Sequence, residues 1–450
     1  MFPVLRRKIK EDQGSVLPIF AVMILLVTVT AGAGIDFARA VNLREKLSIA
    51  LDASALTLAV ELSTSTMTDD EITSSLRKVF AANFFDDTYL ETALANLSYT
   101  LDTDEGTVDI STKAAVPTTF IQLGGIGPET LTVSVNTEVA FSQYEVELAL
   151  VLDVTGSMRS DISTLQEATE SLVDTLISET ATSSTSKVKI SIVPYSQGVN
   201  LGSYASTVSN GNASSNCVTE RLGEAQYTDD PYDYTPDDAT AVSDTYFGGG
   251  SSSCPSSKMT LLPLTSDRDD LMDKIDDLAA SGGTAGQTGV AWGWYTLSPN
   301  WADLWPSESA PSDYDEDGVI KFAVIMTDGD NNAYYGLETT KTCTRSGGGF
   351  GHGNSSQTCT TSTNWAGYSE NEGYNNTSST RARTLCTAMK EKGITVYGVY
   401  FGTNSSSAGA LNMSACASSS SNFYLASSSS ELISAFGNIA KTIQAIRLTK

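Results

Sequence analysis

Small oxygen-bearing side chains follow an apolar run in the segment "VELALVLDVTGSM", residues 146–158. Asp153, Thr155 and Ser157 stand at positions i, i+2 and i+4, directly after five consecutive apolar residues. Carboxylate and hydroxyl oxygens are the ligands that hard divalent cations prefer. The pattern therefore predicts a metal site in a turn that leads from a buried strand into a helix.

Two further segments end in the same chemistry. "SGGTAG" offers Thr284 after two glycines that allow a tight turn, and "VIMTDGDNN" offers Asp328 just past another apolar run. Because ligands of open parallel sheets bind beyond the carboxyl ends of the strands, we expect these loops to meet. The expected ligand set is Asp153, Thr155, Ser157, Thr284 and Asp328.

This set of two carboxylates and three hydroxyls contains no histidine or cysteine, which favours Mg²⁺, with Mn²⁺ or Ca²⁺ as alternatives, over zinc or copper. Mg²⁺ takes about six oxygen ligands and usually keeps some water. At least one position is then left for an acidic side chain of a protein partner.

Each motif also has a purely structural interpretation. Asp153 and its neighbours could cap a helix, and "TDG" could be an ordinary turn. The run from Asp313 to Gly318 starts like a calcium loop, but the twelfth position is Val324 where an EF-hand needs Glu, so a solvated acidic turn is expected.

Composition excludes several functions. The chain has 53 Asp and Glu against 27 Lys and Arg, which argues against nucleic acid as a partner. The single histidine, His352, lies in a glycine-rich loop and is expected to be a solvated loop residue. No Walker motif, G-x-S-x-G or paired histidine is present. We therefore expect no enzymatic activity and no small-molecule substrate.

Six cysteines lie between positions 217 and 416, and none forms a C-x-x-C motif. An even number beyond a membrane segment indicates disulfides in an oxidising compartment. Among the connectivities that six cysteines allow, we expect sequential pairing: Cys217–Cys254, Cys343–Cys359 and Cys386–Cys416.

The N-terminus has the pattern of a membrane anchor. A basic segment, residues 1–14, precedes an uncharged segment, 15–35, which is long enough to cross a bilayer as a helix. The basic flank is expected to stay cytoplasmic and to send the rest into the periplasm or outside the cell. A cleaved signal peptide is the alternative. Residues 36–62 contain no Pro or Gly, so the helix should continue as a stalk.

Beyond the stalk, residues 63–143 predict a small α+β spacer. "MTDDEITSSLRKVFAANFF" indicates a helix, "LSYTLDTDEGTVDISTKAAV" a hairpin, and residues 131–141 another strand.

Residues 144–450 alternate between apolar strands and amphipathic helices, which predicts a mostly parallel α/β sheet covered on both faces. Two insertions, at about 200–258 and 330–380, each hold two cysteines and are expected to be ordered loops. The expected strands are 145–152, 187–195, 321–327, 393–401 and 422–426.

The three motifs, in this order on an α/β pattern, resemble a von Willebrand factor A (VWA) domain over roughly residues 144–447. The resemblance implies a metal-ion-dependent adhesion site (MIDAS) and a Rossmann-like fold. Thr155 stands where that family has Ser, which keeps the hydroxyl and adds a methyl group.

A basic N-terminus, a membrane helix, "IDFARAVNLREKLSIALDASALTLA" and a VWA-like domain together resemble the TadG-like proteins of bacterial tight-adherence (Flp) pilus systems. "GVAWGWYTLSP", "FAVIMTDGDNN" and "FGNIAKTIQAIRL" also look like that family. The resemblance implies an inner-membrane-anchored envelope protein that assists pilus assembly or adhesion.

Two alternatives stay open. The continuous helix and Gly14 resemble a type IV pilin and its processing site, although Ile19 stands where pilins carry Glu; the chain would then be a pseudopilin-like subunit or tip adhesin. The other alternative is a VWA-like scaffold that uses no metal.

Overall fold

The computed structural model describes residues 16–65, 67–103, 105–122, 127–177, 186–211, 213, 216–232, 247–248, 254–346 and 356–449. The expected basic segment and His352 lie outside these residues. The described chain forms two compact units, one of residues Met1–Leu62 and Met67–Phe141 and one of Ser63–Thr66 and Ser142–Lys450. Each is described by itself.

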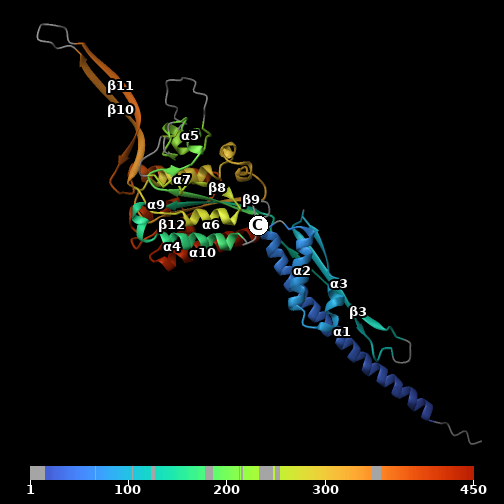
Figure 1. Ribbon diagram of the computed structural model, residues 1–450. Helices are drawn as coiled ribbons and strands as arrows, with labels where there is room; N and C mark the ends of the chain where they lie inside the picture. The colour runs from blue at the N-terminus through green and yellow to red at the C-terminus, as the bar shows by residue number, and fades with distance from the viewer. Residues whose placement is uncertain are drawn as a thin grey trace, which may run out of the picture. The chain divides into compact units, whose positions relative to one another are not determined.

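The first unit is built on one long helix, α1 (Leu17–Thr64), of 48 residues. An 18-residue window of α1 has a mean hydropathy of 2.2 with 6% of the window buried, so its length and composition suit a membrane crossing. Further along, the buried residues Leu43, Leu47 and Leu58 form one face that packs on the rest of the unit. The continuous helix expected through anchor and stalk is present (Figure 1).

Two short helices and a three-stranded sheet cover that face of α1. Thr68 and Glu71 form a capping box that starts the helix α2, whose buried Ile72, Leu76 and Phe80 recur every fourth residue. A short helix that the sequence did not indicate, α3, follows. The elements are α2 (Asp69–Asn83), α3 (Asp87–Ala95), β1 (Ser98–Asp102), β2 (Thr107–Pro117) and β3 (Thr130–Ala140), with antiparallel order β1-β2-β3.

The second unit contains a mostly parallel sheet. Its order is β13-β12-β9-β4-β5-β6-β7, with β8 also paired to β5. The five parallel strands are β4 (Glu145–Asp153), β5 (Val188–Tyr195), β9 (Val319–Thr327), β12 (Thr395–Phe401) and β13 (Phe423–Ala426). The antiparallel strands are β6 (Val199–Asn200), β7 (Cys217–Val218) and β8 (Leu262–Thr265). The expected α/β fold class is thereby confirmed.

Helices cover both faces of this sheet (Figure 1). Successive side chains of a strand point to opposite faces, and in the central strand Leu150 joins one core while Val151 joins the other. The first core includes Leu165 of α4 and Phe436 of α10, and the second includes Trp292 of α7. The helices are α4 (Ile162–Leu176), α5 (Tyr204–Val208), α6 (Arg268–Asp276), α7 (Gly286–Tyr295), α8 (Thr377–Glu391), α9 (Ala408–Cys416) and α10 (Ser429–Thr449).

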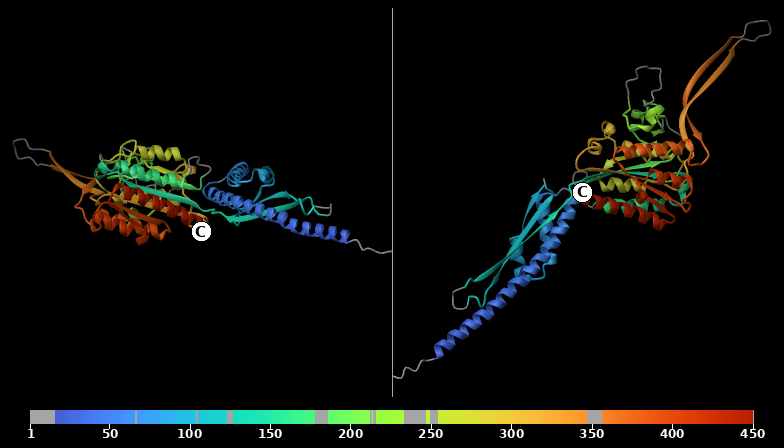
Figure 2. Two further views of the ribbon diagram at one scale, coloured as in Figure 1. Left: turned by 90° about the horizontal axis from the view of Figure 1, so that it is seen from below. Right: turned by 180° about the vertical axis from the view of Figure 1, so that it is seen from behind.

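The second insertion differs from the ordered loop that we expected. It forms a two-stranded antiparallel ribbon, β10 (Ala333–Ser346) and β11 (Ser356–Ser369), which projects away from the sheet (Figure 2). Cys343 and Cys359 are directly opposite in its register and form a disulfide. The strands are rich in Thr and Ser, so they lack the apolar alternation that predicts a strand from sequence.

The other disulfides are Cys217–Cys254, in the first insertion, and Cys386–Cys416, which joins α8 to α9. The three disulfides are the same three pairs that the sequence analysis expected. Both cysteines of the Cys386–Cys416 bridge are fully buried, whereas Cys343 and Cys359 are exposed.

Removing the buried bridge should destabilise the second unit. In a Cys386→Ala/Cys416→Ala variant, the loss of a crosslink over 30 residues should lower the free energy of unfolding by about 3.5 kcal/mol. Urea denaturation followed by tryptophan fluorescence measures this loss. The matched Cys343→Ala/Cys359→Ala variant should unfold near the wild-type midpoint, because its bridge lies within the projecting ribbon; equal losses in both variants would contradict this assignment.

Candidate metal centre

Asp153 is the last residue of the central strand β4, and its side chain is fully buried. Its Oδ1 accepts the backbone N–H of Thr155 at 2.8 Å, and its Oδ2 accepts the Thr327 hydroxyl at 2.6 Å. The Tyr195 hydroxyl lies 3.4 Å from the same Oδ2. The carboxylate is therefore held in one orientation by groups from the ends of the two flanking strands, β5 and β9.

The structure brings four of the five predicted residues into one hydrogen-bonded chain. The Thr155 and Ser157 hydroxyl oxygens lie 2.9 Å apart, and the Ser157 hydroxyl donates to Asp328 Oδ1 at 2.7 Å. Thr155 is buried, Asp328 is half-buried and Ser157 is exposed. The cluster is thus buried on the side of Asp153 and open to solvent on the side of Ser157.

Thr284 belongs to a loop that is bonded to both other loops of the site. The backbone of Gly282 has φ +84°, a conformation that glycine favours, and its carbonyl accepts the Gly156 N–H at 2.9 Å. The Thr284 N–H donates to Asn332 Oδ1 at 2.9 Å, and its carbonyl accepts the Asn332 N–H at 2.9 Å. The Thr284 side chain is buried, and no hydrogen bond joins its hydroxyl to the other four predicted residues within the described chain.

Burial and charge repulsion act on both carboxylates. Burial raises the pKa of Asp153, and hydrogen bonds from Thr155 and Thr327 oppose that effect. Burial, followed by the charge of Asp153, raises the pKa of Asp328 to about 7, against an ordinary value of 3.8. In the described part of the chain, no Lys or Arg forms an ion pair with either carboxylate. Two apposed carboxylates without a cationic partner form a site of unbalanced negative charge.

The donor set fits a hard divalent cation. Its oxygens come from two carboxylates and two or three hydroxyls, the chemistry that Mg²⁺, Mn²⁺ and Ca²⁺ prefer. The described residues contain no group of three or more His, Cys, Asp or Glu side chains suited to a metal, so a site of the thiolate or imidazole type has no candidate there. The hydroxyls of Thr155 and Ser157 are therefore essential to any ligand set built here.

The predicted set omits the residues that orient these side chains. Thr327 and Tyr195 contact Asp153, and Asn332 holds the Thr284 loop. Asn331 Oδ1 accepts the N–H of Gly286, the first residue of α7. Thr327, Asn331 and Asn332 lie in the segment "TDGDNN", and Tyr195 ends a predicted strand. The sequence therefore indicated that these residues lie near the site, but it did not indicate their contacts.

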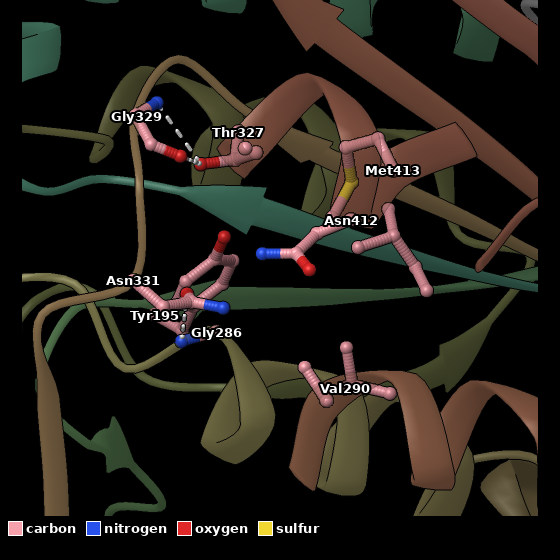
Figure 3. Close-up of a pocket in the computed structure, with 11 residues that line it drawn as sticks. Tyr195, Gly286, Val290, Thr327, Gly329, Asn331, Asn412 and Met413 are labelled. Atoms are coloured by element: carbon pink, nitrogen blue, oxygen red, sulfur yellow. Dashed lines mark hydrogen bonds between the residues drawn. The ribbon is translucent and has the colours of Figure 1, made fainter. Parts of the chain in front are cut away.

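A cavity of about 10 Å³ lies beside these orienting residues, enough for about one water molecule. Tyr195, Thr327 and Asn331 line it on one side, and Asn412 and Met413 line it on the other. Figure 3 shows the amide of Asn412 and the Tyr195 hydroxyl pointing into the space between α7 and the strand ends. Its size excludes an organic ligand.

The loop that carries Asp328 packs closely on helix α9. The backbone N–H of Gly409 donates to Asp330 Oδ1. A Cβ added at Gly409 would lie 2.3 Å from the carbonyl oxygen of Gly329, so only glycine allows this approach.

Gly409→Ala should therefore displace the Asp328 loop. We expect the free energy of unfolding to fall by about 1–3 kcal/mol, as for other overpacking substitutions, and the response to Mg²⁺ to weaken. Gly437→Ala is the matched helical control, because its Cβ would meet only Ser171 Oγ, at 3.9 Å. Thermal melting with and without Mg²⁺ measures both effects, and an unchanged Gly409→Ala variant would show that the close approach is unimportant.

Solved structures with similar folds include three pilus proteins. The adhesin SpaC of Lactobacillus rhamnosus GG has 12% identity and a TM-score of 0.38, over 78% of this chain and 34% of that chain. The vWF domain of the type V pili tip protein Mfa5 from Porphyromonas gingivalis has 14% identity and a TM-score of 0.38, over 69% of this chain and 98% of that domain's chain. The adhesin RrgA of Streptococcus pneumoniae has 12% identity and a TM-score of 0.34, over 77% of this chain and 49% of the RrgA chain. At these scores the fold assignment rests on the strand order given above.

The chain spans about a third of the length of the SpaC chain, 34%. No curated protein matches the sequence. The N-terminal segment, residues 14–59, matches the family described as "Putative Flp pilus-assembly TadE/G-like", which confirms the TadG-like resemblance of the part that holds the apolar helix.

Proposed function

We propose that this chain is a non-enzymatic, membrane-anchored protein of the bacterial envelope that assists the assembly of Flp-type pili or adhesion by them. Its second unit binds a protein partner through a divalent cation, most readily Mg²⁺, held by Asp153, Thr155, Ser157, Thr284 and Asp328. Helix α1 anchors the chain in the inner membrane, and the bulk of the chain lies in the periplasm or outside the cell.

The observation that supports this proposal is the hydrogen-bonded chain that links Asp153 to Asp328 through Thr155 and Ser157 at the open edge of the sheet. A bound cation would neutralise the two carboxylates and offer a Lewis-acidic position to a partner's carboxylate. Asp153 would hold the cation from the buried side, and the exposed Ser157 marks the side from which a partner approaches.

The membrane and pilus parts of the proposal have separate support. The helix α1 has the length and hydropathy of a membrane span, and the family match covers that same segment. Three disulfide bonds suit an oxidising compartment outside the cytoplasm.

A second candidate is a pseudopilin-like subunit or tip adhesin that is incorporated in the fibre. It is favoured by the continuity of α1, whose apolar first part is exposed and whose later part packs on a sheet. Mass spectrometry of sheared fibres separates the candidates: a peptide that begins directly after Gly14 supports the subunit, and an intact N-terminus found only in the membrane fraction supports the anchored assembly factor.

The test of the function is a chromosomal replacement in the bacterium that carries this chain. Deletion should abolish or strongly reduce surface pili and attachment, and Asp153→Asn should reproduce that loss at wild-type protein levels. Asp317→Asn, an exposed acidic residue outside the site, is the matched control and should behave as wild type. A deletion strain with normal pili and attachment would overturn the pilus role, and a fully active Asp153→Asn strain would overturn the role of the metal site.

A further inference from the structure

A buried carboxylate ties the helix α1 to the loop between β2 and β3. Asp36 stands just after the uncharged run of α1, and its side chain is fully buried. Its Oδ2 accepts three backbone N–H groups, from Thr119 at 3.1 Å, Phe120 at 2.8 Å and Ile121 at 3.0 Å. Hydrogen bonds to an ionised acceptor are stronger than neutral ones, so this clamp fixes the loop at one level of the helix.

The same loop contacts the helix one turn closer to the N-terminus. A Cβ added at Gly32 would lie 2.2 Å from Cγ of Phe120, so the ring packs directly on the helix backbone. The base of the loop is closed by Thr118, whose N–H donates to the Glu129 carbonyl at 3.0 Å and whose hydroxyl donates to the Pro128 carbonyl at 2.5 Å. Phe120 and Ile121 are therefore placed beside the last apolar turn of α1.

The length of the helix sets the depth of that turn in a bilayer. The uncharged part of α1, residues 17–35, forms about 30 Å of helix, which equals the thickness of a typical hydrocarbon core. Its outer end, where Gly32 and Ile35 stand, must then lie at the boundary between acyl chains and headgroups. Ile35 and Phe37 expose 49% and 65% of their surfaces at this level.

We propose that residues 118–122, at the start of the β2–β3 loop, form a second membrane contact, with Phe120 and Ile121 in the headgroup region of the bilayer that α1 crosses. Residues 118–122 suit this environment because they carry no charge, and aromatic and aliphatic side chains favour the interface. The clamp from Asp36 satisfies three backbone N–H groups that a membrane interface would otherwise leave poorly solvated.

Two membrane contacts at different points restrict the orientation of the first unit more than one contact does. A single helix can tilt and rotate about its axis in a bilayer, whereas interfacial anchors fix both. The loop would therefore set the orientation of the first unit on the membrane surface. This inference rests on the membrane crossing in the proposed function, and its test includes a separate probe of that crossing.

The experiment places single nitroxide labels on the full chain in lipid nanodiscs and measures their collisions with O₂ and with a water-soluble nickel chelate. Gln122→Cys reports on the loop and leaves Phe120 and Ile121 intact. Asn136→Cys, on an exposed part of β3, is the aqueous reference, and Val22→Cys reports on α1. We expect the label at 122 to have a several-fold higher ratio of O₂ to nickel collisions than the label at 136.

Two helix glycines provide the matched variants. Gly32→Val should displace Phe120 and move the label at 122 into water, whereas Gly34→Val should leave it in place because a Cβ there has nothing within 4 Å. An aqueous label at 122 with label 22 in hydrocarbon overturns the loop contact and leaves the anchor standing. An aqueous label at 22 overturns both. An unchanged collision ratio for the label at 122 in Gly32→Val would show that the packing of Phe120 on Gly32 does not hold the loop.

Discussion

Replacing Asp153 by asparagine should abolish the rise in melting temperature that Mg²⁺ gives the full chain in detergent. A cation that binds only the folded state stabilises it by about 2.7 kcal/mol at a hundredfold excess over the dissociation constant, and the variant should gain nothing. The metal-free variant should melt at or above the metal-free wild type. Burial raises the pKa of Asp153, which means that its charged form is disfavoured, and a neutral side chain of the same shape removes that cost.

Asp317→Asn is the control for this result. Asp317 lies in the exposed acidic turn, residues 313–318, which starts like a calcium loop. The variant should keep the full response to Mg²⁺. Loss of the response in Asp317→Asn together with its retention in Asp153→Asn would move the metal site to the turn and contradict our assignment.

The affinity for Mg²⁺ should fall about tenfold between pH 8 and pH 6. Asp328 has its pKa raised to about 7 in the metal-free fold, and it must lose its proton to bind a cation. Because its folded pKa lies above its unfolded value of 3.8, the metal-free protein holds the proton more tightly than the unfolded chain does. The metal-free form therefore loses stability as the pH rises from about 4 through 7, and the bound cation restores it.

Titration calorimetry at pH 6, 7 and 8 and constant ionic strength measures this dependence. Asp328→Asn should bind more weakly at every pH and should show a flatter profile, since the titrating ligand is gone. Equal affinity of the wild type for Mg²⁺ at pH 6 and pH 8 would exclude Asp328 as a metal ligand that must lose a proton near pH 7.

The sequence was sufficient to predict the elements that position the site. β4 is a run of apolar residues buried on both faces, and Asp153 at its end is the first polar side chain after Glu147. Strand patterns of this kind depend on local composition alone, so the order of β4, α4, β5, β9 and β12 was predictable. The proximity of Asp153, Thr155, Ser157 and Asp328 was predictable because the carboxyl ends of parallel strands meet at one edge; their role as metal ligands stays a prediction.

Other features depend on contacts between residues far apart in the sequence. The hydrogen bond from Thr327 to Asp153 and that from Asn332 to the Thr284 loop arise only when the sheet is assembled. The ribbon of β10 and β11 was missed because its strands carry no apolar period, and residues 338–344 and 357–363 are all exposed. Its stability comes from ladder pairing and the Cys343–Cys359 bridge, and neither leaves a periodic pattern.

The site itself is tested most directly by counting bound Mn²⁺ on the full chain by electron paramagnetic resonance, with Mg²⁺ as the competitor. We predict one Mn²⁺ per chain, displaced by Mg²⁺, absent in Asp153→Asn and weakened in Ser157→Ala. Ser157 is exposed and its hydroxyl links Thr155 to Asp328, so the variant should fold normally. Mn²⁺ bound equally well by the wild type, Asp153→Asn and Ser157→Ala, or bound by none of them, would contradict the proposed metal centre.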